Sequence, residues 1–200
     1  VRLVGVTKPR LPEVETAEEL VAYTARVSNP GNQANILTAP KLLKYLVTNH
    51  HWSPFEMVHV VMEINTTREI ARQILRHRSF SFQEFSQRYA DVNELPAADL
   101  REARLQDKKN RQNSVEVDDA ELEEEWAKQQ ATVLMASRDA YAWAMSNGIA
   151  KEQARVVLPE GLTTSRLYMS GTLRSWVHFC QLRGGNGTQK EHRILAQEAL

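Results

Sequence analysis

Apolar side chains recur along this chain at strand-like and helix-like spacings. Three stretches rich in β-branched residues predict strands, RLVGVTK at 2–8, VHVVMEIN at 58–65 and TSRLYMS at 164–170. Apolar residues three and four positions apart predict helices over 16–28, 40–48, 68–77, 119–146, 151–158, 172–183 and from 190 onward. The mixture predicts an α+β fold, a helix-dominated single domain over residues 1–200.

Capping residues locate several helix ends. Thr16 with Glu19, and Thr66 with Glu69, form capping-box patterns, and Asn147-Gly148 closes the longest helix. A helical start is also predicted at Ser53, where a proline follows in the first turn. The second helix is expected to bury Leu42, Leu43, Tyr45 and Leu46, and the longest one carries its apolar positions at Leu122, Trp126, Val133, Leu134, Tyr141 and Met145.

Residues 92–118 interrupt this pattern. They are polar and show no periodicity, which predicts an insertion that leaves the domain as a mobile excursion. The acidic run DDAELEEE follows it and suits the positive end of the next helix, so it needs no ligand to explain it.

Composition limits the classes of protein. Lysine plus arginine equals aspartate plus glutamate at 25 each, so no overall basic field would attract nucleic acid or a membrane surface. The single cysteine, Cys180, excludes an internal disulfide and a cysteine-built zinc site. With no stretch of membrane-spanning length and no signal peptide pattern, the sequence predicts a cytoplasmic protein without membrane or metal partners.

Arginine without lysine marks the segment after the second strand. Arg68, Arg72 and Arg76 fall on one side of a helix, opposite its apolar residues, and Arg78 and Arg88 follow with no lysine among them. This bias favours planar, bidentate recognition of phosphate or carboxylate. The alternative is that the cations at 76–78 only complement the helix dipole, which contributes about 0.3–1 kcal/mol each.

The residues after this helix are harder to explain as a cap. The stretch RHRSFSFQEFSQRY at 76–89 adds Glu84, Ser86 and Tyr89 to the arginines. Hydroxyl groups and guanidiniums together suit a phosphate, and a carboxylate suits a sugar hydroxyl or an imide N–H. An anion-binding site is therefore predicted here.

This stretch resembles the signature of the flavin-dependent thymidylate synthases. The family has an Arg-His-Arg triplet, seven intervening residues and then a serine, with a glutamate two places before the serine and an Arg-Tyr pair after it; Gln83 stands where many members carry asparagine. The segments HHWSPFE, ARVVLP, GTLRSWVHF and QLR also resemble family segments, in family order. The resemblance covers nearly the whole chain, and residues 92–118 match no motif.

The resemblance implies a fold with a small antiparallel sheet and an activity. Members convert dUMP to dTMP with FAD, with NADPH and methylenetetrahydrofolate as co-substrates, and they are homotetramers whose active sites are shared between subunits. The flavin supplies the hydride chemistry, and the protein supplies position and electrostatics.

The resemblance also implies residue roles. Arg183 matches the arginine that activates the pyrimidine by favouring ionisation at N3, and His51 matches a histidine close to flavin or folate. The flavin-binding positions are Ser53, Arg76, His77, Arg78, Glu84, Thr172, Arg174 and His178, and the dUMP-binding positions are Gln73, Arg76, Glu84, Ser86, Gln87, Arg88, Arg155 and Arg183.

Several of these residues have plainer alternatives. His178 lies in an apolar stretch and could be a core histidine, Thr172 could be a helix N-cap, and Cys180 is expected in the core rather than as a nucleophile. Ser86 would be a nucleophile only if a base activated it. Two rival functions remain at this point, a nucleic-acid or nucleotide-binding module and a nucleotide phosphohydrolase, which would need clustered carboxylates for Mg²⁺.

Overall fold

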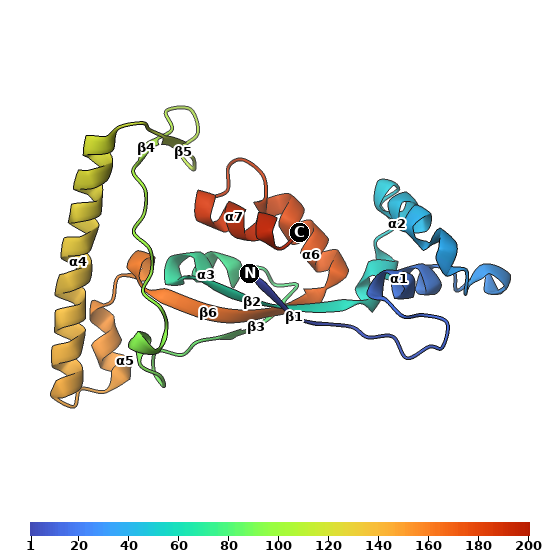
Figure 1. Cartoon of the computed structure of the whole chain (residues 1–200), viewed down its shortest axis with the longest axis horizontal. Helices are drawn as coiled ribbons and strands as arrows, with labels where there is room; N and C mark the ends of the chain where they lie inside the picture. Colours follow the sequence, from blue (N-terminus) through green and yellow to red (C-terminus); the bar gives the residue numbers. More distant parts are fainter.

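The computed structural model describes all 200 residues. It contains seven α-helices, six strands and six short 3₁₀ segments, which confirms the α+β fold (Figure 1). The strands are β1 (Arg2–Val6), β2 (His59–Thr67), β3 (Ser81–Glu84), β4 (Arg104–Gln106), β5 (Ser114–Glu116) and β6 (Thr164–Thr172). The helices are α1 (Ala17–Ala25), α2 (Ala39–Thr48), α3 (Arg68–Ile74), α4 (Ala120–Ser146), α5 (Lys151–Ala154), α6 (Leu173–Arg183) and α7 (Lys190–Glu198). The 3₁₀ segments are η1 (Pro30–Asn32), η2 (Ile36–Thr38), η3 (Ser53–Met57), η4 (Val92–Glu94), η5 (Arg155–Val157) and η6 (Glu160–Leu162).

The central sheet is antiparallel throughout, as predicted, with the strand order β1-β2-β6-β3. Its centre is the long pair β2–β6, whose register joins His59 to Thr172 at one end and Thr67 to Thr164 at the other. Both strands extend two residues beyond their predicted ends because each continues the other's hydrogen-bond ladder. Strand β3 was not predicted, since four residues with one apolar side chain among them give only a weak signal.

One face of the sheet carries the core. Ile64, Leu167 and Met169 are fully buried there beneath α3 and α6, and the indole N–H of Trp176 donates to the carbonyl of Val60 at 3.1 Å. The helices α3, α6 and α7 all lie on this side of the sheet, α1 and α2 lie at one end and α4 and α5 at the other (Figure 1). No helix is both long and apolar enough to cross a membrane.

Two of the predicted caps differ in outcome. The capping box of Thr16 and Glu19 is present in both directions. The box of Thr66 and Glu69 is wrong: the N-cap is Thr67, which makes no cap bond because its hydroxyl accepts from Arg101 instead. Glu69 pairs with the same arginine at 2.8 Å.

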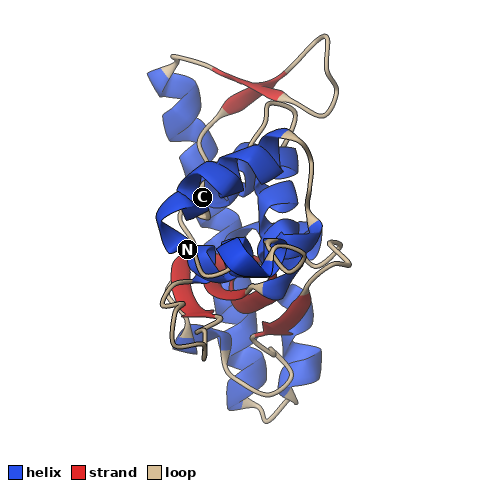
Figure 2. Ribbon diagram, turned by 90° about the vertical axis from the view of Figure 1, so that its right-hand side faces the viewer, coloured by secondary structure: helices blue, strands red, loops and turns tan.

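The polar segment 92–118 contains more structure than its sequence predicted. Strands β4 and β5 form a hairpin that stands apart from the central sheet (Figure 2), and two other residues of the segment, Leu95 and Ala103, are buried. Gln130 of α4 fixes the backbone of Arg101 by accepting from its N–H at 2.7 Å and donating to its carbonyl at 2.8 Å. The segment therefore contains a short hairpin that its polar, aperiodic sequence did not predict.

Other predictions of burial differ from the structure as well. The helix α4 starts and ends where predicted, with Asp119 as its N-cap and Gly148 in the left-handed conformation after it. Among the apolar positions of α4, Leu122, Trp126 and Val133 are exposed in the single chain, whereas Tyr141 is buried. Tyr45 of α2 is exposed rather than buried. The start at Ser53 is a 3₁₀ segment whose N-cap is Trp52, so Ser53 itself is not a cap.

Candidate active site

Two strand-to-helix reversals aim α3 and α6 at each other. At one end of the β2–β6 pair the chain turns from β2 directly into α3, where the Arg68 N–H donates to the carbonyl of Thr163 at 3.0 Å. At the other end it turns from β6 into α6, where the Leu173 N–H donates to the carbonyl of Val58 at 2.8 Å. Both helices then run back over the same face, so their C-terminal ends meet.

The Arg-His-Arg triplet lies at this meeting point. Helix α3 ends at Ile74, three residues before its predicted end, so the triplet occupies the turn between α3 and β3. His77 is half-buried, while Arg76 and Arg78 are exposed and form no ion pair. The ring of Phe80, just after the triplet, packs edge-on against Trp176 at 5.0 Å. Gly171 makes room for it, since a Cβ there would come within 2.5 Å of the Phe80 ring.

His77 and Arg183 are joined directly. The Nε of Arg183 donates to Nε2 of His77 at 3.0 Å, and the imidazole packs edge-on against Phe179 at 5.0 Å. Burial, followed by the charges of Arg183 and Arg76, lowers the pKa of His77 below its ordinary value. The ring is therefore neutral near pH 7, and with Nε2 accepting it carries its hydrogen on Nδ1.

Gln73 completes this group from the last turn of α3. Its Nε2 donates to Oε1 of Gln189 at 2.8 Å, and its Oε1 lies 3.3 Å from Nδ1 of His192. We refer to Gln73, His77 and Arg183 as the α6-end cluster. Neither Gln189 nor His192 was predicted as a site residue. His192 shares a helix face with the buried Leu195 and Ala196, and this spacing was the available signal.

A second group lies where α6 begins. Arg174 pairs with Glu56, and the His178 ring packs edge-on against Trp52 at 4.7 Å. Ser53 and Glu56 lie on η3, which contacts α6. We refer to Ser53, Glu56, Arg174 and His178 as the α6-start cluster.

Two of the plainer alternatives are decided here. His178 is exposed, so the core-histidine alternative is wrong. Thr172 is the N-cap of α6, with its hydroxyl accepting from the Ser175 N–H at 3.2 Å. His51 is exposed and packs edge-on against Tyr45 at 5.8 Å.

The two clusters are separated by the length of α6. Arg174 and Arg183 are nine positions apart, which corresponds to about 14 Å at the rise of an α-helix. The predicted flavin-binding residues are therefore divided between both ends of one helix.

Glu84 and the residues after it form a third region. Ser165, which is fully buried, donates to Oε1 of Glu84 at 2.7 Å, and Arg68 pairs with the same oxygen at 3.4 Å. Both partners of this carboxylate were outside the predicted site. They leave its second oxygen, Oε2, free of protein partners.

The serine of the signature lies beside a cavity of about 390 Å³. We call it the Ser86 cavity; its lining includes Ser86, Arg88 and Lys151, and Arg88 pairs with Glu152 at 3.1 Å across an exposed surface. Gln87 is buried instead, and its Nε2 has no hydrogen-bond partner. Arg155 lies at the start of η5 and forms no ion pair.

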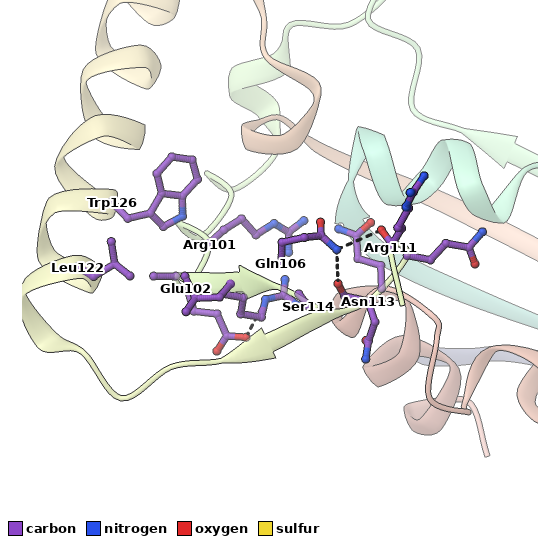
Figure 3. Close-up of a pocket in the computed structure, with 13 residues that line it drawn as sticks. Arg101, Glu102, Gln106, Arg111, Asn113, Ser114, Leu122 and Trp126 are labelled. Atoms are coloured by element: carbon purple, nitrogen blue, oxygen red, sulfur yellow. Dashed lines mark hydrogen bonds and ion pairs between the residues drawn. The ribbon is translucent and has the colours of Figure 1, made fainter. Parts of the chain in front are cut away.

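A further cavity lies away from most of the predicted residues. It has a volume of about 560 Å³, is open to solvent and is lined mainly by the hairpin and α4, from which Trp126 and Leu122 project toward it (Figure 3). Two of the arginines that line this cavity already form ion pairs with carboxylates, Arg101 with Glu69 and Arg104 with Glu191. Gln189 is the lining residue that touches the predicted site, through Gln73.

Cys180 lies in the core, as predicted. It is 4% exposed, and burial raises the pKa of its thiol. A buried thiol without a nearby cation is held in its protonated form and is a poor nucleophile.

Comparison with known proteins gives a consistent picture. Residues 10–200 match the family model Thy1, described as thymidylate synthase complementing protein. The chain is 52% identical over 195 residues to a protein of Paramecium bursaria Chlorella virus 1 named a probable flavin-dependent thymidylate synthase, covering 98% of this chain and 89% of that one. It is 48% identical over 202 residues to the flavin-dependent thymidylate synthase of Synechocystis sp., covering 100% and 91%.

Solved structures agree with these relatives. The UMP/dUMP methylase PolB of Streptomyces cacaoi, bound with 5-Br dUMP, superposes with a TM-score of 0.78 at 27% identity, covering 98% of this chain and 85% of that one. The same enzyme bound with 5-Br UMP superposes with a TM-score of 0.79 at 26% identity, covering 98% and 84%.

Proposed function

This chain belongs to the family of flavin-dependent thymidylate synthases, and on that premise we propose that it converts dUMP to dTMP. Bound FAD would supply the hydride, NADPH would be the reductant and methylenetetrahydrofolate the one-carbon donor. The observation that carries the proposal is the contact between Arg183 and His77, because it joins a residue predicted to act on the pyrimidine to one predicted to hold the flavin.

Arg183 is suited to activate the pyrimidine. Its Nε is occupied by His77, so the side chain is fixed in direction while its two terminal nitrogens remain free for the substrate. A guanidinium stays charged at every working pH, and beside the imide of uracil it would stabilise the negative charge of a ring ionised at N3.

The residues present fit a flavin. Neutral His77 presents an Nδ1–H donor, and Arg76 and Arg78 are exposed without carboxylate partners, so their charges are available to a diphosphate. Ser53, Arg174 and His178 would hold the flavin at the start of α6, with Thr172 shaping the helix end. Glu84 would accept from an N–H or a hydroxyl through its free Oε2. His51 would lie on the flavin or folate side.

The Ser86 cavity is suited to the phosphate of dUMP. Ser86 supplies a hydroxyl donor and Arg88 a guanidinium, with Gln87 and Arg155 as the further residues of this region. Arg88 can exchange its partner readily, because an exposed ion pair such as the one with Glu152 contributes only about 0–1 kcal/mol.

UMP is the second candidate substrate. The solved structure of PolB is described as a UMP/dUMP methylase and was also determined with 5-Br UMP. We favour dUMP because the two relatives that share about half of their residues with this chain are both named thymidylate synthases.

We propose further that the enzyme works as a homotetramer in the cytoplasm, with active sites shared between subunits. Apolar side chains on α4, among them Trp126, Val133 and Trp143, are exposed in the single chain and would be covered by another subunit. The division of flavin residues between two ends of α6 fits a site completed by a neighbour. Sedimentation equilibrium is expected to give four times the chain mass, and an active monomer would contradict this.

An anaerobic assay of dTMP formation tests the activity. The purified protein is expected to be yellow from bound flavin. After the flavin is stripped, the protein is expected to make dTMP only when dUMP, FAD, NADPH and methylenetetrahydrofolate are all added back. Omitting any one component should abolish product, and UMP in place of dUMP should be the poorer substrate. Colourless protein that takes up no added FAD, or product formed without folate, would overturn the proposal.

A further inference from the structure

Two side chains at the start of α7, one from its N-cap and one from its first turn, already hold Gln73, a residue predicted to bind dUMP. The Gln73 Nε2 donates to Gln189 at 2.8 Å, and its Oε1 lies 3.3 Å from Nδ1 of His192. Gln189 is the residue just before α7, and His192 follows in its first turn.

His192 is placed where packing alone would favour an apolar residue. It is fully buried beside Phe179, at 5.7 Å between ring centroids, and its Nε2 has no hydrogen-bond partner. A buried polar atom left unpaired costs about 1–3 kcal/mol, so the side chain does not serve stability through that nitrogen. Its one polar contact is with Gln73.

The burial of His192 and the charged residues around it determine its charge state. Burial, followed by the charges of Arg183 and His77, lowers its pKa to about 4, so the ring is neutral near pH 7. The amide oxygen of Gln73 can only accept, and Nδ1 of His192 must therefore carry the hydrogen and donate to it.

These two bonds determine the direction of the Gln73 amide. Its oxygen is turned toward His192 and its nitrogen toward Gln189, so one N–H and one lone pair remain for a ligand. A free glutamine would lose rotamer entropy on binding, and a glutamine held in advance loses less.

We propose that His192 and Gln189 are positioning residues for dUMP, which orient Gln73 before the nucleotide binds. The inference rests on the proposed function, since it concerns the same substrate. Neither residue need touch the nucleotide, and both act through Gln73.

The first turn of α7 is itself anchored to the insertion. Glu191 pairs with Arg104, and Lys190 pairs with Glu102 at 2.8 Å and Glu116. Residues of the hairpin therefore fix the turn that carries Gln189 and His192. The segment 92–118, which matches no motif, thus helps to position Gln73 through the first turn of α7.

Three substitutions test the proposal on the flavin-loaded enzyme. His192→Leu fills the space and removes the donor. His192→Asn keeps a donor, because it places an amide N–H at about the position of Nδ1. Gln189→Ala removes the second contact to Gln73. Glu198→Gln, on the exposed side of α7, is the matched control. The readouts are the Kd for radiolabelled dUMP by equilibrium dialysis, the KM for dUMP and kcat.

His192→Leu and Gln189→Ala are each expected to raise the Kd and KM for dUMP about tenfold, as expected for the loss of one positioning hydrogen bond, with kcat nearly unchanged. His192→Asn should stay within about threefold of the parent enzyme, a difference of under 1 kcal/mol. A flavin-loaded His192→Leu enzyme with the parent Kd, or an asparagine variant as weak as the leucine one, would overturn the proposal.

The outcome stays decisive if His192→Leu does not fold. Gln189 is only half-buried, so its alanine variant is expected to fold, and an unchanged Kd for dUMP in that variant would sink the inference. Failure of the proposed function itself would show differently, because the parent enzyme would then bind no dUMP.

Discussion

Arg183, in the last turn of α6, and His77, in the turn that follows α3, meet through one hydrogen bond of 3.0 Å between Nε and Nε2. The bond requires a neutral imidazole, and the low pKa of His77 provides it. Each side chain therefore fixes the other: the histidine directs the guanidinium, and the guanidinium selects the tautomer of the histidine.

Replacing Arg183 is expected to remove most of the activity. Arg183→Ala loses the charge beside the pyrimidine and should lower kcat by about two to three orders of magnitude, as for other groups that stabilise a developing anion. Arg183→Lys keeps a charge but not the fork-shaped donor set, and should recover only part of the rate. Tritium release from C5-labelled dUMP measures the step, and near-normal release by Arg183→Ala would exclude this role.

Cys180→Ala is the matched control for a cysteine-dependent mechanism. The thiol is buried and protonated, so its removal is expected to leave kcat unchanged. The small cavity should lower the free energy of unfolding by about 1 kcal/mol, which urea denaturation measures. Loss of turnover in a folded, flavin-loaded Cys180→Ala enzyme would show that the thiol takes part.

Gly171→Ala is expected to disturb the Arg-His-Arg triplet by displacing the ring of Phe80. The added Cβ would come within 2.5 Å of the Phe80 ring, and overpacking of this kind costs about 1–3 kcal/mol. Because Phe80 follows Arg78 by two residues, flavin retention on gel filtration should fall together with stability. Adding Phe80→Leu should restore both, and a double variant no better than Gly171→Ala would contradict the steric explanation.

His192 is expected to make the protein acid-sensitive. Its folded pKa of about 4 lies below the unfolded value near 6.5, so the unfolded chain takes up a proton that the folded chain refuses. The contribution of His192 to the free energy of unfolding is therefore complete above pH 6.5. It is lost as the pH falls toward 4, and about 2 kcal/mol of it is lost at pH 5. His192→Leu should flatten urea-unfolding free energies between pH 7 and pH 5. A variant with the same slope as the parent would refute the assignment.

Arg101 is expected to hold the insertion to the body of the protein. Its guanidinium donates to Thr67 and pairs with Glu69 and Glu191, and the side chain is mostly buried. Arg101→Met should lower the free energy of unfolding by about 2 kcal/mol, since it leaves two half-buried carboxylates short of a partner. Limited proteolysis should then cut within 92–118. Arg111→Met, an exposed position of the same hairpin without an ion pair, should behave as the parent.

Local signals predicted the helices well and failed where a distant residue intervenes. Thr16 caps α1 because its partner Glu19 is three residues away. The same pattern failed at Thr66 because Arg101, more than thirty positions later, takes the groups that a cap would use. Strand β3 likewise exists through its pairing with β6, and no property of its four residues alone reveals that partner.

The candidate site was also predicted only in part from the sequence. The triplet, Glu84 and Arg183 stand out by residue type, but the contacts that hold them do not. Ser165 and Arg68, which hold Glu84, look like ordinary strand and helix residues until the sheet brings them together. His192 looks like one more polar residue of a surface helix until its burial is known.

The length of α6 imposes a constraint on how this chain can change over evolution. The helix carries Arg174 near its first turn and Arg183 in its last, with no loop between them to absorb an insertion. Deleting one residue would turn one cluster by about 100° against the other and shorten their separation by about 1.5 Å. Insertions and deletions are thus expected to be eliminated within α6 and to be tolerated at the tip of the hairpin, residues 107–113.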